Sequence, residues 1–172
     1  MDKQPSGYVV GMLAEEREIA CLLGEFLVRW SMAEFTLLMP IIRASGVSQQ
    51  IAASMLAATN SAEGKIKLVK SVVANSPLDA IEKKAIAEAV KALERLCDAR
   101  NGICHHLWAV GNEGGVFTLD HRKSVGADGF RTRRSPEELR ELCNSTVSAA
   151  VAICKASGSA WANEETIRTY AI

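Results

Sequence analysis

The apolar residues between Ile81 and Leu107 recur every three to four positions, and this spacing constrains the fold more than any other feature of the chain. It matches one face of an α-helix. Ser76 and Pro77 provide a helix start signal, with serine as the N-cap and proline in the first turn. The pattern therefore predicts one long helix from Pro77 to about His106, with one side buried.

Four further segments have helical patterns, and each is bounded by a capping residue or a helix breaker. The first combines a broad apolar side with polar residues at helical spacing, and the last begins with a capping box in which proline takes the first helical position. They are Val9–Met39, which Pro40 ends, Ser48–Ala58, Ala62–Ala74 and Pro136–Ala156, which Ser135 caps.

The stretch 108–134 has a different pattern. Trp108–Val110 and Val116–Leu119 flank a glycine-rich loop and predict a β-hairpin, and residues 125–132 are a candidate third extended piece. The predicted fold class is all-α: an antiparallel helical bundle with a small β-hairpin insertion at 108–134, before the last long helix. Residues 1–172 are expected to form a single domain, because this length suits one core.

Charge and composition narrow the functional classes. Lys+Arg and Asp+Glu both number 20, so affinity for a polyanion must come from a local basic patch. We find no signal-peptide pattern and no apolar run long enough to span a membrane. The five cysteines form no CxxC pair. These features predict a cytoplasmic protein with free thiols and no membrane partner.

The densest polar group in an otherwise aliphatic setting is Arg100–His106, at the end of the predicted long helix. Histidine moves protons near neutral pH, and arginine binds phosphate and stabilises charge that grows in a transition state. An amide such as Asn101 can orient either group. The alternative is purely structural, because cationic side chains also stabilise the C-terminal end of a helix.

Arg100 and Asn101 are followed, after three further residues, by His105, and this order resembles the R-x(4–6)-H motif of HEPN domains. Trp108 extends the likeness to the family pattern RNxxAHxxW. The chain departs from that pattern at Cys104, where a small residue is usual, and at His106, where glycine is common. The preceding helices are also similar to those of the family, with Trp30 and Glu34 on the first and residues 64–73 on a middle one.

The resemblance implies a helical homodimer in which two copies of the motif meet at the dimer cleft, and a metal-independent endoribonuclease without a cofactor. Arg100 would bind the scissile phosphate, and His105 would activate the ribose 2′-OH or protonate the leaving oxygen. Asn101 would orient them, and His106 would replace His105 or add a second imidazole.

Many members are toxins or antiviral effectors, so an antitoxin is a candidate partner. Others bind without cleaving, which leaves enzymatic activity open. The alternative is a non-catalytic module that binds RNA, a nucleotide or a protein.

A second feature bears on RNA. The run from His121 to Arg134 contains five basic residues that are candidate contacts for a phosphate backbone, and Phe130 is a candidate for stacking on a base. The five are Arg122, Lys123, Arg131, Arg133 and Arg134.

Zinc is a poor alternative explanation of the cysteines and histidines. Cys97 and Cys104 are seven residues apart on one predicted helix, a rise of about 10 Å, which is too far for both to hold one ion. No metal ligand set is therefore predicted.

Overall fold

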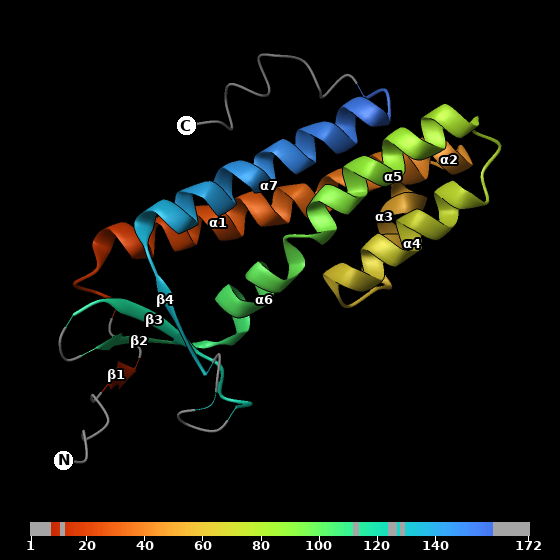
Figure 1. The fold of residues 1–172 in the computed structure, drawn as a ribbon. Coiled ribbons are helices and arrows are strands. Elements are labelled where there is room, and N and C mark those ends of the chain that lie inside the picture. Colours follow the sequence, from red (N-terminus) through yellow and green to blue (C-terminus); the bar gives the residue numbers. More distant parts are fainter. Residues whose placement is uncertain (1–7, 11–12, 112–113, 124–126, 128–129, 160–172) are drawn as a thin grey trace. The chain divides into compact units, whose positions relative to one another are not determined.

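The computed structural model describes residues 8–10, 13–111, 114–123, 127 and 130–159. The chain is mostly helical with a small antiparallel sheet, so the predicted mostly helical character is confirmed, and the predicted bundle stays a prediction (Figure 1). The elements are β1 (Tyr8–Val10), α1 (Arg17–Thr36), α2 (Leu38–Ser45), α3 (Gln49–Ala57), α4 (Ala62–Ala74), α5 (Ala80–Glu94), α6 (Cys97–His105), β2 (Leu107–Gly111), β3 (Val116–Leu119), β4 (Arg131–Arg134) and α7 (Pro136–Ala156).

The chain divides into two compact units. The first comprises the chain up to Phe26 together with Asp98–Leu142, and it holds the sheet and α6. The second comprises Leu27–Cys97 together with the chain from Cys143, and it holds α2 to α5. The assignment of residues 1–172 to a single domain stays a prediction.

The first helix is shorter than the predicted range 9–39, which is wrong at both ends. Tyr8–Val10 form strand β1, because aromatic and β-branched residues suit a strand once a neighbouring strand is available. At the other end α1 stops at Thr36, the residue whose carbonyl the ring of Pro40 would meet in a continuous helix. Pro40 lies instead in the first turn of α2, where no backbone N–H is required.

The predicted single helix over 77–106 is two helices, α5 and α6. After α5 the N–H of Leu96 donates to the carbonyl of Leu93, three residues back, which is a tightened turn that interrupts the α-helical pattern. The predicted N-cap is also wrong. The cap is Asp79, whose Oδ1 accepts from the N–H of Glu82 at 2.8 Å, while the Ser76 hydroxyl donates to the preceding helix.

The other three helical predictions are confirmed to within a residue at each end. Ser48 caps α3 by accepting from the N–H of Ile51, and α4 has the predicted bounds. Ser135 Oγ accepts from the N–H of Glu138 at the start of α7, as a capping box requires. These local signals succeed because each acts within about four residues.

The sheet has four strands in the order β1-β2-β3-β4, all antiparallel, so the predicted hairpin is only its centre (Figure 1). Of the third extended piece predicted over 125–132, residues 131–132 belong to β4 (Arg131–Arg134), while 125–126 and 128–129 lie outside the described residues. Gly114 and Gly115, in the β2–β3 loop, have φ of 88° and 90°. Glycine adopts this conformation at no steric cost, which explains the glycine pair.

Each unit has its own buried apolar residues. Those of the first unit include Phe26, Ile103, Ala109 and Leu139, and those of the second include Leu37, Ile41, Val69, Val90, Leu93 and Ile153. All five cysteines carry free thiols. No helix in the described ranges is both long and apolar enough to cross a membrane.

Trp30 and Glu34 of α1 form a buried polar link in the second unit. Trp30 Nε1 donates to Glu34 Oε1 at 2.6 Å, and Lys65 of α4 pairs with Glu34 Oε2. The carboxylate thus has a partner on each oxygen, as a largely buried charge requires.

Candidate functional site

The C-terminal half of α6 brings Arg100, Asn101 and His105 together in the first unit. Arg100 Nη1 lies 2.9 Å from Nε2 of His105 and donates to Oδ1 of Asn101 at 3.3 Å. On a regular helix Arg100 and His105 would lie about 140° apart, so the length of the arginine side chain closes the gap. His105 is exposed, and its ring can therefore meet a ligand from solvent.

In a neutral His105 ring, the contact with Arg100 selects one tautomer. A guanidinium has donors and no acceptor, so Nε2 accepts and the ring proton lies on Nδ1. Nε2 then carries the lone pair that a general base needs, and Arg100 lies at the same atom. An imidazole base and a phosphate-binding cation side by side suit proton transfer at a phosphate ester.

Trp108 fastens the strand that follows this site. Its Nε1 donates to the carbonyl of Ile103 at 2.9 Å, in the last turn of α6. This bond satisfies a helix-end carbonyl that has no partner within the helix. The tryptophan after the motif thus connects α6 to β2.

His106 lies in a different environment from its neighbour His105. Its Nε2 is 3.2 Å from Nη2 of Arg122 and 3.6 Å from Oδ2 of Asp120. Its Nδ1 is buried and makes no hydrogen bond with the described residues. The adjacent histidines therefore belong to two separate sets of contacts.

The pKa values of His106 and Asp120 are both lowered, for different reasons. Burial lowers the pKa of His106 below its usual value near 6.5; the Asp120 charge opposes this shift, and the charges of Arg122, Arg134 and His121 add to it. Hydrogen bonds from Arg122 hold the pKa of Asp120 well below its usual range, against the opposing effect of burial. At neutral pH the pair is a neutral imidazole and a carboxylate.

We expect the stability of the protein to depend on pH through His106. Because its pKa is lower in the folded than in the unfolded state, the unfolded chain binds the proton first as the pH falls below about 6.5, and stability is lost there. Between about pH 7.5 and 5.5 the thermal midpoint of the wild type should fall about 2 °C further than that of His106→Gln. Scanning calorimetry measures this. Equal slopes in the wild type and His106→Gln would contradict the prediction.

Strand alternation divides the basic run between two faces. Arg131 and Arg133 are exposed and lie on the face of Phe117, with the Arg131 guanidinium 5.5 Å from the centre of its ring. Arg134 points the other way and is buried. Its Nε donates to Thr118 Oγ1 at 3.0 Å, and its Nη1 pairs with the carboxylate of Glu138. Arg134 therefore differs from the other candidate RNA contacts, because its bonds hold β3, β4 and α7 together.

Gly102 permits the close approach of α6 to these residues. A Cβ at this position would lie 3.1 Å from Arg134 Nη2 and 3.7 Å from His106 Nδ1. A side chain would force the buried guanidinium to move. The glycine at position 102 therefore allows this close packing.

Asp120 is the residue that the sequence reasoning missed. It directly follows β3 and is 5% exposed, with Arg122 two residues later. An acid two residues before an arginine at the end of an apolar strand is a usable signal for a turn that pairs the two. Lys123, also a candidate RNA contact, lies in this turn and is exposed.

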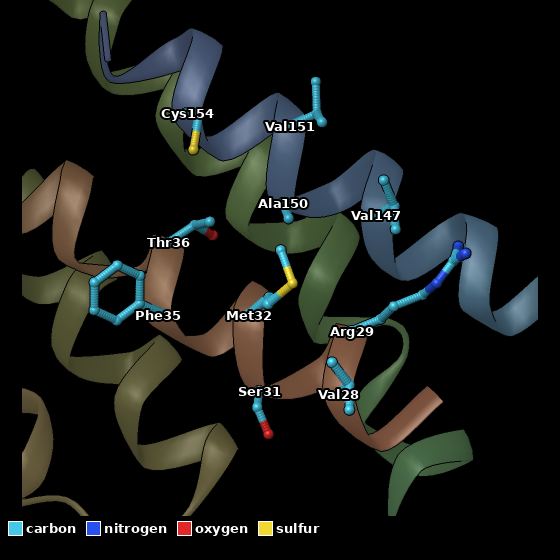
Figure 2. A pocket seen from close by; sticks show the side chains of 10 residues that line it. All are labelled: Val28, Arg29, Ser31, Met32, Phe35, Thr36, Val147, Ala150, Val151 and Cys154. Atoms are coloured by element: carbon cyan, nitrogen blue, oxygen red, sulfur yellow. The ribbon is translucent and has the colours of Figure 1, made fainter. Parts of the chain in front are cut away.

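A concave surface lies in the second unit. A groove of about 470 Å³ lies between α1 and α7. Its lining is mainly apolar and includes Val28, Met32, Phe35, Val147 and Val151 (Figure 2). Arg29 lies at one end and donates to Asn144 at 3.4 Å, and burial raises the pKa of the Cys154 thiol. The lining contains neither histidine nor carboxylate, so this groove suits apolar contact rather than acid–base chemistry.

The described residues contain no group of three or more His, Cys, Asp and Glu side chains that could hold a metal ion. Comparisons with protein families, curated proteins and solved structures give no match.

Proposed function

We propose that the chain is a HEPN-type, metal-independent endoribonuclease that acts as a homodimer. The observation that carries the proposal is the 2.9 Å contact between Arg100 Nη1 and His105 Nε2. The motif residues that the resemblance names are in contact through the atoms that the chemistry uses. Asn101, bonded to the same guanidinium, orients it.

In the proposed reaction the RNA supplies its own nucleophile. A phosphate that binds Arg100 takes over its donors and releases the lone pair on Nε2 of His105. The imidazole then accepts the proton of the ribose 2′-OH, the O2′–P bond forms, and the P–O5′ bond breaks. The products are a 2′,3′-cyclic phosphate and a 5′-OH, whose oxygen takes up a proton from an imidazolium.

The homodimer belongs to this proposal because it places a second His105 and a second Arg100 in one cleft. One imidazole then acts as base while the other, protonated, acts as acid. Exposed apolar side chains on α1 support association between copies: Leu27, Val28 and Phe35 are 42%, 63% and 41% exposed. An antitoxin that covers the same cleft fits a toxin role.

We expect the face of Arg131, Arg133 and Phe117 to contact the RNA backbone. Reversing the charge of Arg131 and Arg133 to glutamate should weaken the binding of single-stranded RNA by about tenfold and reduce the slope of log K against log salt by about 1.4, near 0.7 for each lost phosphate contact. Fluorescence anisotropy over a salt series measures both. Unchanged affinity would exclude this face from the interaction.

The alternative is a non-catalytic HEPN-like module that binds RNA, a nucleotide or a protein partner. The Arg131–Phe117 contact favours it, because a cation beside an aromatic ring is a platform for a base or a phosphate without any need for cleavage. Such a module has no turnover, which separates the two functions.

The experiment that tests the proposal is the cleavage of a mixed RNA pool by the purified protein in excess EDTA, with the molar mass of the same sample determined by light scattering. A dimer that cuts RNA without metal and leaves cyclic phosphate ends supports the nuclease. No cutting at high protein concentration contradicts it and favours the binding module.

A further inference from the structure

The turn after β3 is built around a buried carboxylate. Asp120 Oδ1 accepts from Nε of Arg122 at 2.8 Å and from its backbone N–H at 3.1 Å, and Oδ2 accepts from Nη2 at 3.0 Å. The carbonyl of Asp120 also accepts from the N–H of Lys123 at 3.0 Å. A carboxylate with this many donors holds the guanidinium in one orientation.

The fixed guanidinium reaches His106, the residue that follows α6. The same Nη2 lies 3.2 Å from Nε2 of His106, the residue directly after His105. The turn is thereby attached to the end of the helix that carries Arg100 and His105. The Arg122 side chain is nevertheless 70% exposed, and its Nη1 makes no hydrogen bond within the described ranges.

We propose that Asp120 is a positioning residue of the RNA site: by fixing Arg122 against His106, it presents the outer edge of that guanidinium to a phosphate next to the one that is cleaved. This inference rests on the proposed function and extends it with a second phosphate subsite. The ligand is a phosphodiester of single-stranded RNA, since the planar guanidinium suits phosphate oxygens. Asp120 does not touch the RNA and acts through Arg122.

The arrangement has a specific consequence for His106. Because Arg122 donates to Nε2, the ring holds its proton on Nδ1, whereas an unconstrained neutral histidine favours Nε2. This tautomer is a spectroscopic signature of the Asp120–Arg122–His106 contact and does not depend on RNA.

The test compares Asp120→Asn and Arg122→Lys with the wild type. Asparagine keeps the size of the side chain and loses the charge, while lysine keeps the charge and loses the planar guanidinium. The first readout is the affinity for a 2′-O-methyl RNA, which lacks the nucleophilic hydroxyl and cannot be cleaved. We expect both variants to bind about fivefold or more weakly, and where RNA is cleaved, KM should rise with kcat within about twofold.

The second readout is ¹⁵N NMR of the His106 ring, which should show Nδ1–H in the wild type and a shift toward Nε2–H in both variants. Glu82→Gln, which breaks an Arg–carboxylate pair with Arg43 on the surface of the other unit, is the matched control and should leave both readouts unchanged. Thermal midpoints establish that the variants are folded.

The outcomes separate this inference from the proposed function. Affinity of Asp120→Asn within twofold of the wild type, or an Nε2–H ring in the wild type, overturns the positioning role whether or not the protein cuts RNA. Wild-type affinity in Arg122→Lys overturns the requirement for a fixed guanidinium. Weaker binding by both variants without any cleavage by the wild type supports the subsite and contradicts only the nuclease.

Discussion

His105→Ala is expected to lower kcat for RNA cleavage by about 10²–10⁴-fold, the range for loss of a general acid–base group. In the proposed reaction His105 supplies the lone pair at Nε2, and water in its place is a far weaker base at neutral pH. Because the side chain is exposed and bonds only to Arg100 among the described residues, its removal should leave the fold intact. Gel-based rate measurements in EDTA at equal folded concentration determine the effect.

His106→Ala is the matched control for this prediction. Its ring lies in the Asp120–Arg122 contact rather than at Arg100, so its loss should change kcat much less than the loss of His105. A large drop in kcat for His106→Ala together with normal turnover in His105→Ala would reverse the assignment. Equal cleavage by both single variants and the double variant would identify a contaminant.

Arg134→Met is expected to lower the free energy of unfolding by about 2–4 kcal/mol. Methionine fills part of the space but leaves Thr118 Oγ1, which is fully buried, without its donor, and it removes the pair with Glu138. Urea denaturation followed by circular dichroism measures the loss.

Arg133→Met provides an internal comparison one residue away. Arg133 is exposed on the opposite face of β4, so we expect a change within about 0.5 kcal/mol. A double-mutant cycle with Thr118→Val isolates the hydrogen bond, and a coupling energy near zero would show that this bond contributes nothing to the loss. Equal losses for Arg133 and Arg134 would contradict the alternation.

The two arginines illustrate where sequence reasoning succeeds and where it ends. The run of basic residues is visible in the sequence, and all five candidates appear equivalent there. Their separation depends on the register of β4 against β3, which pairs Arg133 with Phe117 and Val116 with Arg134. A register is a pairing between segments far apart in the chain, and the sequence pattern of one segment does not contain it.

The same distinction applies to the helices. Ser48 and Ser135 predict their helix starts correctly because a cap is a contact between residues three or four apart. The strand at Tyr8–Val10 was not predictable in this way, since its partner β2 lies about a hundred residues later. A short segment whose residues suit either a helix or a strand adopts the structure that its tertiary pairing stabilises.

The amino-acid sequence by itself determined the mostly helical class, the caps of α3 and α7, the central hairpin, and Arg100, Asn101 and His105 as a candidate site, because these depend on residues close together in the chain. Only the tertiary structure decided the contacts of Asp120 with Arg122, the separation of His105 from His106 and the burial of Arg134. Each of these depends on how β3, β4 and the turn of residues 120–123 meet the end of α6. The physical reason is that hydrogen bonding and burial are properties of the neighbours in space, and those neighbours come from distant parts of the chain.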